Sequence, residues 1–311
     1  MKDPKSRTYE VIIIGGGPAG MTAGLYTTRS RFRTLLIESA LFGGQMNTTD
    51  LIENYPGFPK GVSGEELSRL MEEQAKRFGL EMASEEVLEV RLEGEQKYVR
   101  TYDSDYLCEA LIICTGTEYR KLGVLGEKEF TGRGVSFCST CDGAFFQDRK
   151  IVVVGGGDSA LTEALYLTKF VNELTIIHRR DALRATKIYQ ERAQTHPKIK
   201  FLWNSVVQEI KGDNVVRSIL VKNVKTGETK EFETDGAFIF VGISPKTQFL
   251  KGFVEMDEAG YIVTDRNCET SVKGVFAAGD CRKQLLRQIA TAVGDGATAG
   301  FAVEKYLEGK E

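Results

Sequence analysis

The chain has 311 residues, of which 41% are hydrophobic and 27% are charged, and its formal net charge is −3. This length is enough for two domains of ordinary size, and the composition is typical of a soluble globular protein. The weak net charge gives no indication of nucleic-acid binding, and no apolar run reaches the roughly 18 residues that a membrane span needs. The first ten residues are polar and lack the apolar core of a signal peptide, so we expect a cytoplasmic protein.

The first predicted element is a buried parallel strand, the apolar run 11–14, and a glycine loop from Gly15 to Gly20 follows it directly. A helix is predicted over 21–30, and a second strand over 34–37 ends in Glu38. When a strand is followed by a G-x-G-x-x-G loop and then a helix, the glycines let the backbone turn tightly and approach a pyrophosphate. The N-terminus of the helix attracts the phosphates. Glu38 is placed to accept hydrogen bonds from ribose hydroxyls. One such motif alone is a weak signal, because an ordinary glycine-rich turn can produce it.

Cys138 and Cys141 form a C-x-x-C pair, which is typical either of half a zinc site or of a redox-active dithiol. A zinc site needs three or four ligands, and no second pair occurs among the remaining cysteines, Cys108, Cys114, Cys268 and Cys281. Two cysteines that merely pack together are a further alternative. We favour the redox dithiol, because the short spacing can bring the sulfurs within disulfide range and a neighbouring group can activate one thiolate. No metal site is therefore predicted.

Thiol–disulfide exchange also requires proton transfer. The chain has only two histidines, and neither is close in sequence to the cysteine pair. Asp142, which directly follows Cys141, is therefore the candidate acid. A helix N-cap is the alternative role for this residue.

The whole glycine-loop unit recurs 140 residues later, with a strand over 151–154, a loop from Gly155 to Ala160, a helix over 161–170 and a strand over 174–177. Two such units in register predict two dinucleotide sites. The second unit ends in His178, Arg179 and Arg180, with Arg184 nearby, whereas the first ends in an acidic residue. Basic residues suit a 2′-phosphate, although a solvated charge cluster is the alternative. The first site is predicted to bind FAD or NAD and the second NADPH.

Three further apolar runs, over 110–116, 237–242 and 275–280, are predicted strands that return beside the nucleotide sites, and the last ends in Asp280. Cys114 lies within the first of them and is expected in the core. The segment 288–306 is the predicted closing helix. We predict an α/β fold of two Rossmann-like dinucleotide-binding domains, of the three-layer ββα type, with the second inserted in the first. Residues 1–119 and 248–311 form the FAD-binding domain, and 120–247 form the NADPH-binding domain with the C-x-x-C pair.

Over nearly its full length the chain resembles the low-molecular-weight, bacterial-type thioredoxin reductases. The resemblance rests on both glycine loops, on 43–45 and 53–57, on 138–142, on 178–180 with Arg184, and on 279–280 and 287–288. It implies an FAD-dependent homodimer that uses NADPH to reduce the disulfide of thioredoxin or a similar small protein. It also implies that the inserted domain rotates between two orientations. The chain departs from the family at Leu286, where a tyrosine is common, and at 243–246.

The resemblance implies that Cys138 and Cys141 are the redox pair and that Asp142 is the proton donor. It implies that FAD contacts Gly15, Gly17, Pro18, Ala19, Gly20, Glu38, Gly43, Gly44, Gln45, Asn54, Thr115, Gly116, Gly279, Asp280, Arg287, Gln288, Ile289 and Ala290. It implies that NADPH contacts Gly155, Gly157, Asp158, Ser159, Ala160, His178, Arg179, Arg180 and Arg184. Two other functions stay open. One is a flavin NAD(P)H oxidase or ferredoxin-type reductase with an incidental cysteine pair, and the other is a non-catalytic redox sensor.

Overall fold

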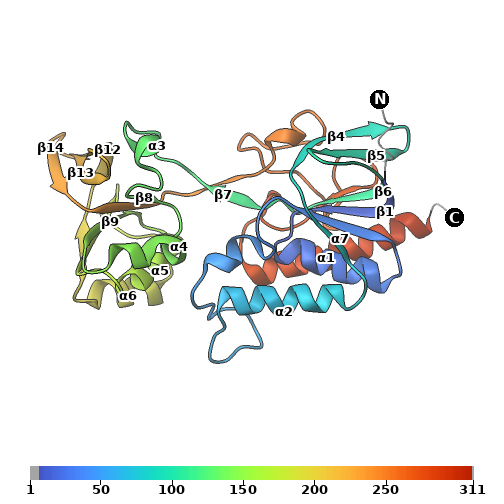
Figure 1. The fold of residues 1–311 in the computed structure, drawn as a ribbon, viewed down its shortest axis with the longest axis horizontal. Coiled ribbons are helices and arrows are strands. Elements are labelled where there is room, and N and C mark those ends of the chain that lie inside the picture. Colours follow the sequence, from blue (N-terminus) through green and yellow to red (C-terminus); the bar gives the residue numbers. More distant parts are fainter. Residues whose placement is uncertain (1–6, 310–311) are drawn as a thin grey trace. The chain divides into compact units, whose positions relative to one another are not determined.

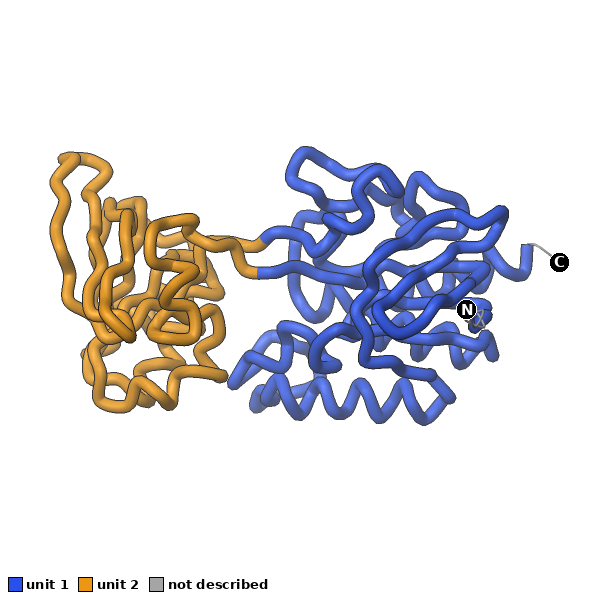
Figure 2. Tube along the Cα trace, turned by 45° about the horizontal axis from the view of Figure 1, so that its top comes forward, with its two compact units in different colours: residues 1–118, 244–311 blue, residues 119–243 orange. Residues whose placement is uncertain are grey.

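The computed structural model describes residues 7–309, which divide into two compact units (Figure 2). The first comprises the described residues of 1–118 and 244–311, and the second comprises 119–243. The chain passes between them through β7 (Thr117–Tyr119) and β16 (Ile243–Pro245), which pair in a two-stranded sheet. Residues 244–247 belong to the first unit, and the Lys246 N–H there donates to the Gly116 carbonyl at 3.1 Å.

The first unit is built on a seven-stranded sheet with helices along one face (Figure 1). Its strand order is β3-β2-β1-β6-β5-β4, and β17 also pairs with β6. The strands β3, β2, β1, β6 and β17 pair in parallel, whereas β4 and β5 form an antiparallel hairpin. Its other elements besides β7 and β16 are β1 (Arg7–Ile14), α1 (Pro18–Arg29), β2 (Thr34–Glu38), η1 (Gly44–Thr48), α2 (Gly64–Lys76), β3 (Glu81–Ser84), β4 (Val87–Glu93), β5 (Gln96–Thr101), β6 (Asp105–Ile113), η3 (Gln248–Leu250), β17 (Val275–Ala277) and α7 (Ile289–Glu308).

Both faces of this sheet are buried, which explains the continuous apolar runs of its central strands. On one face, Ile13 and Ile112 pack with small side chains of α1 and α7. The two helices approach so closely that a Cβ on Gly296 would lie 2.2 Å from the Ala19 carbonyl oxygen. On the other face, Ile12 packs with residues of the segment 249–262. Because the parallel strands run in the same direction, their carboxyl ends lie at one edge of the sheet, and open α/β sheets bind their ligands at this edge.

The second unit repeats this plan with a five-stranded parallel sheet in the order β11-β10-β9-β15-β8 and a separate antiparallel sheet β12-β13-β14. Helices α5 and α6 cover one face of the parallel sheet, and the antiparallel sheet covers the other. The predicted fold class, three-layer ββα, is therefore confirmed. The elements are α3 (Glu127–Phe130), β8 (Val135–Ser136), α4 (Ser139–Asp142), η2 (Gly143–Phe146), β9 (Lys150–Gly155), α5 (Asp158–Leu167), β10 (Glu173–Ile177), α6 (Lys187–Thr195), β11 (Ile199–Leu202), β12 (Ser205–Gly212), β13 (Val216–Asn223), β14 (Thr229–Glu233) and β15 (Gly236–Phe240).

Both nucleotide-loop helices begin three residues earlier than the sequence predicts. Helix α1 starts at Pro18 and α5 starts at Asp158, inside the glycine motifs. The last motif residue, Gly20 or Ala160, already lies in the first helical turn, where it packs against the start of its own loop. The apolar pattern begins only after that turn, so periodicity alone placed the start too late. None of the helices within 7–309 has the length and apolar character needed to cross a membrane.

Candidate functional site

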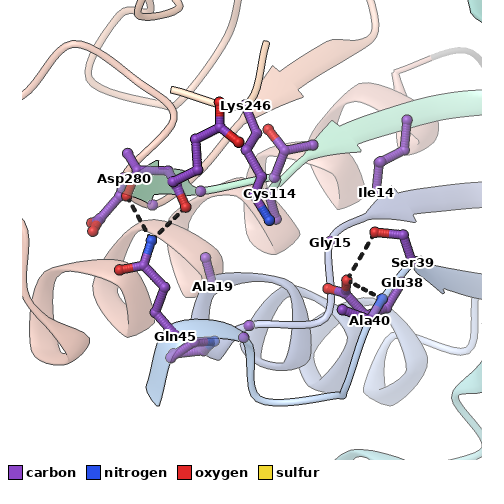
Figure 3. Close-up of a pocket in the computed structure, with 18 of the residues that line it drawn as sticks. Ile14, Gly15, Ala19, Glu38, Ser39, Ala40, Gln45, Cys114, Lys246 and Asp280 are labelled. Atoms are coloured by element: carbon purple, nitrogen blue, oxygen red, sulfur yellow. Dashed lines mark hydrogen bonds between the residues drawn. The ribbon is translucent and has the colours of Figure 1, made fainter. Parts of the chain in front are cut away.

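The carboxyl ends of the parallel strands in the first unit open into a pocket of about 830 Å³ (Figure 3). This volume is within the usual range for sites that bind cofactors. Figure 3 shows Glu38 and Asp280 at opposite sides of the pocket, with Gly15 and Ala19 between them. The predicted cofactor residues that line it are Gly15, Gly17, Pro18, Ala19, Glu38, Gly44, Gln45, Thr115, Gly116, Gly279, Asp280, Gln288 and Ile289.

The first glycine loop turns tightly at the end of β1. Gly15 has a φ of +109°, and a Cβ there would lie 2.2 Å from the Cys114 carbonyl oxygen, so only glycine fits. Gly17 caps α1 without a side-chain hydrogen bond, which leaves the N–H groups of the first helical turn available to an anion. A Cβ on Gly17 would meet no atom within 4 Å. The loop is thus a cradle that a pyrophosphate can approach closely.

Glu38 is held at the end of β2 by two backbone groups. Its Oε2 accepts from the Gly16 N–H at 2.7 Å, and its Oε1 accepts from the Ala40 N–H at 2.9 Å. Each carboxylate oxygen can accept a second hydrogen bond. The residue can therefore close the loop and still bind the hydroxyls of a ribose.

Asp280 lies in the pocket beyond the end of β17. Burial raises the pKa of its carboxyl to about 6, Asp295 adds to this, and the nearby Arg287 opposes it. Gln284 donates to its Oδ1 at 3.4 Å. The guanidinium of Arg287 lies over the ring of Tyr261, 4.1 Å from its centre. A glycine cradle at one side of the pocket and a buried carboxylate at the other fit an elongated dinucleotide such as FAD.

Five of the residues expected to contact FAD do not line the pocket: Gly20, Gly43, Asn54, Arg287 and Ala290. Gly20 and Gly43 support the loop from behind, and the Gly43 N–H donates to the Gly16 carbonyl at 2.8 Å. Asn54 donates to Gln288 Oε1 at 2.8 Å, so it orients a residue that does line the pocket. Ala290 is exposed in the first turn of α7.

Several lining residues were not predicted from the sequence, and two groups among them lie far from the glycine loop in the chain. Glu85, Glu86 and Val87 follow β3, and Lys246, Gln248 and Phe249 follow β16. No motif marks either group. The first group reaches the pocket because β3 pairs in parallel with β2, with Ser84 beside Glu38, so the residues after β3 continue at the same sheet edge.

The second glycine loop has the same backbone arrangement as the first, but a different side chain packs beneath it. Helix α5 begins after Gly157, where a Cβ would again meet no atom within 4 Å. His178 takes the place of Glu38, and its buried ring lies so close beneath Gly156 that a Cβ there would be 2.3 Å from Nδ1. Burial lowers the pKa of His178, a hydrogen bond to the Ala182 carbonyl opposes this, and Arg184, Arg180 and Arg179 lower it further. His178 therefore supports the loop as a neutral ring, which leaves positive charge to the arginines.

Three arginines follow β10 in the segment beside this second loop. Arg179, Arg180 and Arg184 are all exposed, and no carboxylate among residues 7–309 forms an ion pair with any of them. The Arg184 N–H donates to the Gly156 carbonyl at 2.8 Å, which ties this basic segment to the loop. Oδ1 of Asp158 accepts a hydrogen bond from the Thr186 N–H at 2.6 Å. The arrangement can bind a phosphate beyond the end of β10.

Cys138 and Cys141 are joined in a disulfide, with their Cα atoms 5.4 Å apart. Cys138 is the N-cap of α4, and its Sγ accepts from the Cys141 N–H at 3.2 Å. Asp142 ends α4 and occupies the N-cap position of η2, where its side chain makes no capping hydrogen bond. The other four cysteines are buried, and Cys114 lies in the core as predicted. Within residues 7–309, no three His, Cys, Asp or Glu side chains come together as a metal site requires.

Known proteins are similar to this chain in sequence and in fold. The sequence model of the family described as pyridine nucleotide-disulphide oxidoreductase matches residues 9–296. The chain belongs to this family. The matched range includes both glycine loops and the cysteine pair.

Individual relatives extend over almost the whole chain. Thioredoxin reductase from Bacillus subtilis is 50% identical over 305 residues, which cover 98% of this chain and 96% of that protein. A crystal structure of thioredoxin reductase from Lactococcus lactis superposes with a TM-score of 0.95 at 49% identity, and it covers 97% of this chain and 99% of its own. The thioredoxin reductase of T. acidophilum reaches a TM-score of 0.92 at 38% identity, with coverage of 98% and 100%.

Proposed function

We propose that this chain is an NADPH-dependent thioredoxin-disulfide reductase. It carries electrons from NADPH through FAD and the Cys138–Cys141 pair to the disulfide of thioredoxin or a similar small redox protein. The observation that carries the proposal is the disulfide between Cys138 and Cys141 in a chain that also holds two glycine-loop sites. The names of the relatives support the same activity.

The two cofactors are assigned by charge. The first loop, with Glu38 at the strand end, suits the ribose diol of FAD, whose phosphates would approach the N-terminus of α1. The second, with three exposed arginines that form no ion pair within residues 7–309, suits the 2′-phosphate of NADPH. Bound FAD would supply the two-electron carrier between the nicotinamide and the disulfide.

The cysteine pair performs the exchange with the partner protein. Two electrons and two protons convert the Cys138–Cys141 disulfide to a dithiol. One thiolate of the pair then attacks the partner's disulfide, which forms a mixed disulfide and releases a partner thiolate. The second cysteine attacks the mixed disulfide, so the Cys138–Cys141 bond forms again and the partner leaves as a dithiol. Asp142, next in the chain to Cys141, holds and delivers the protons that these steps exchange.

The test uses three variants. Cys138→Ser and Cys141→Ser are expected to bind FAD and to let NADPH bleach it, but to lose the reduction of thioredoxin. Cys108→Ala, which removes a buried thiol elsewhere, is the control and is expected to keep full turnover. Thioredoxin turnover in both Ser variants would overturn the proposal. NADPH consumption without disulfide reduction in the native chain would instead identify an NAD(P)H oxidase, and dinucleotide binding without turnover would identify a sensor.

We further propose that the protein acts as a homodimer in the cytoplasm. Tyr26 on α1 lies against Gly300 of α7, next to Phe301, and both aromatic side chains are exposed. Adjacent exposed aromatic residues suit a surface between two copies. The cytosol is the compartment where thioredoxin keeps thiols reduced. Sedimentation of the native chain and of Phe301→Glu tests the dimer, and cell fractionation tests the location.

A further inference from the structure

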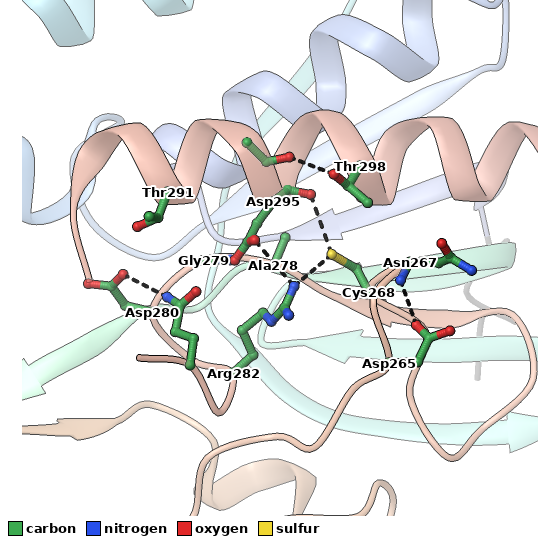
Figure 4. Close-up of polar contacts among 12 residues, drawn as sticks. Asp265, Asn267, Cys268, Ala278, Gly279, Asp280, Arg282, Thr291, Asp295 and Thr298 are labelled. Atoms are coloured by element: carbon green, nitrogen blue, oxygen red, sulfur yellow. Dashed lines mark hydrogen bonds and ion pairs between the residues drawn. The ribbon is translucent and has the colours of Figure 1, made fainter. Parts of the chain in front are cut away.

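A largely buried polar cluster lies beside the turn that contains Asp280 (Figure 4). The Nη1 of Arg282 forms an ion pair with Oδ1 of Asp295 at 3.2 Å, and the two side chains are only 14% and 19% exposed. The same Nη1 lies 2.8 Å from Cys268 Sγ, which accepts from it. The other carboxylate oxygen of Asp295 accepts from the Gly279 N–H at 3.1 Å. Asp295 thus joins an arginine to the backbone of the residue that precedes Asp280.

These contacts close a ring around the turn 279–282. The Arg282 N–H donates to the Gly279 carbonyl at 3.2 Å, so Arg282 reaches Gly279 once through its backbone and once through Asp295. Gly279 has a φ of +78°, and a Cβ there would lie 2.9 Å from the Cβ of Ala19. The turn is therefore crowded against α1 and held at both polar groups of Gly279. Its conformation decides how Asp280 enters the pocket.

Cys268 adds a third anchor to the cluster. Its φ of 67° is left-handed, a region that a residue with a Cβ seldom adopts. Its carbonyl accepts from the Ala277 N–H at 2.9 Å, which joins it to β17. Burial raises the pKa of its thiol to about 11, against the opposing effect of Arg282, so its sulfur is a neutral acceptor. Cys268 therefore gives the Arg282 guanidinium a second partner besides Asp295.

A buried ion pair needs a reason beyond stability, because desolvation of two charges offsets much of their attraction. We propose that Asp295, fixed by Arg282 and Cys268, is a positioning residue that holds the turn 279–282 so that the Asp280 carboxylate faces the flavin pocket. This inference rests on the proposed function, because it assumes that FAD binds in that pocket. Asp295 itself does not line the pocket, so it acts only through Gly279 and Asp280.

The experiment measures FAD binding rather than turnover. FAD is titrated into cofactor-free protein, and the dissociation constant and the shape of the flavin's visible absorption band are recorded. Asp295→Ala removes the acceptor of the Gly279 N–H, and its dissociation constant is expected to rise about tenfold, as the loss of a charge-assisted hydrogen bond implies. The absorption band is expected to shift as well, because the group facing the flavin changes its position. Asp295→Asn keeps an oxygen acceptor of the same reach, so a smaller rise, about threefold, is expected.

A matched control separates positioning from general destabilisation. Val303→Ala lies on the same helix, α7, about two turns beyond Asp295, and truncates a fully buried side chain. It is expected to lower the unfolding midpoint while leaving FAD affinity and the absorption band as in the native chain. If Val303→Ala weakens FAD binding as much as Asp295→Ala does, the inference is overturned.

The remaining outcomes are equally distinct. Native affinity and a native absorption band in Asp295→Ala would overturn the inference alone, while FAD binding by the native chain would leave the proposed function intact. If Asp295→Ala does not fold, native values in Asp295→Asn overturn it in the same way. Failure of the native chain to bind FAD would instead remove the proposed function, and the inference with it.

Discussion

A Cβ on Gly20 would lie 1.9 Å from the carbonyl oxygen of Gly15, whereas a Cβ on Gly17, in the same loop, would meet no atom within 4 Å. The two glycines therefore serve different purposes. Gly20 lets α1 pack against the start of the loop, and Gly17 keeps the surface of the pocket open to a ligand.

This difference predicts that alanine reduces the stability of the protein at position 20 but weakens FAD binding at position 17. Gly20→Ala should lower the free energy of unfolding of the cofactor-free protein by about 1–3 kcal/mol, because the overpacked loop must move. Gly17→Ala should stay within about 1 kcal/mol of the native chain, the cost of alanine at a helix N-cap, and should weaken FAD binding instead. Urea denaturation and FAD titration of both variants provide the measurement. Native FAD affinity in Gly17→Ala would contradict the placement of the pyrophosphate at this loop.

The arginines beside the second loop predict a preference between nicotinamide cofactors. The double variant Arg179→Ala with Arg180→Ala should raise the KM for NADPH about tenfold or more, because two partners of the 2′-phosphate are lost. The KM for NADH, which lacks that phosphate, should change little. Arg149→Ala is the matched control, since Arg149 is an exposed arginine of the same unit that pairs with Asp235 at 3.8 Å. An equal rise for NADPH and NADH would show that the arginines do not read the 2′-phosphate.

The proposed role of Asp142 predicts that its substitution slows the reduction of thioredoxin but not the reduction of the flavin by NADPH. Asp142→Asn should reduce thioredoxin turnover about a hundredfold, the usual contribution of a positioned acid, and should leave the bleaching of the flavin by NADPH unchanged. Asp148→Asn, an exposed aspartate of the same unit, is the control. Stopped-flow absorbance measures the bleaching, and a coupled thioredoxin assay measures turnover. Unchanged turnover in Asp142→Asn would assign the proton to another group.

The raised pKa of Asp280 predicts how the stability of the cofactor-free protein depends on pH. In the folded protein the pKa of the Asp280 carboxyl is about 6, compared with its ordinary value of 3.8, because burial disfavours the charged carboxylate. The free energy of unfolding should therefore fall as pH rises from about 4 to 6, by at most about 3 kcal/mol, and the loss should persist above pH 6.

Asp280→Asn should remove this dependence and unfold at higher denaturant concentration than the native chain at pH 7 to 8. The two proteins should approach each other near pH 4, which provides an internal control. Denaturant unfolding across this pH range is the measurement. A native chain that gains stability between pH 4 and 6 relative to Asp280→Asn would contradict the assignment.

The sequence by itself was sufficient for the parts of the protein that are encoded locally. Runs such as 11–14 and 151–154 are apolar because their strands are buried on both faces, and that pattern is visible without knowledge of neighbours. The glycine loops are equally visible in the sequence because of their spacing, although Gly15 and Gly155 also approach the carbonyl groups of Cys114 and Phe240, which are distant along the chain. The two units and the insertion of one in the other followed from these patterns. The cysteine spacing favoured a redox pair over a zinc site or simple packing, and the disulfide between Cys138 and Cys141 fits that prediction.

Only the tertiary structure decided which side chains reach the pocket and which support it. Asn54 acts through Gln288, and Gly279 is held by Asp295 from a different element. His178, expected to supply charge, lies buried beneath Gly156. Such relationships join residues that are distant along the chain or depend on the direction of a side chain in a packed interior. Periodicity and spacing describe one element at a time, so they contain no information about contacts that arise only when separate elements pack together.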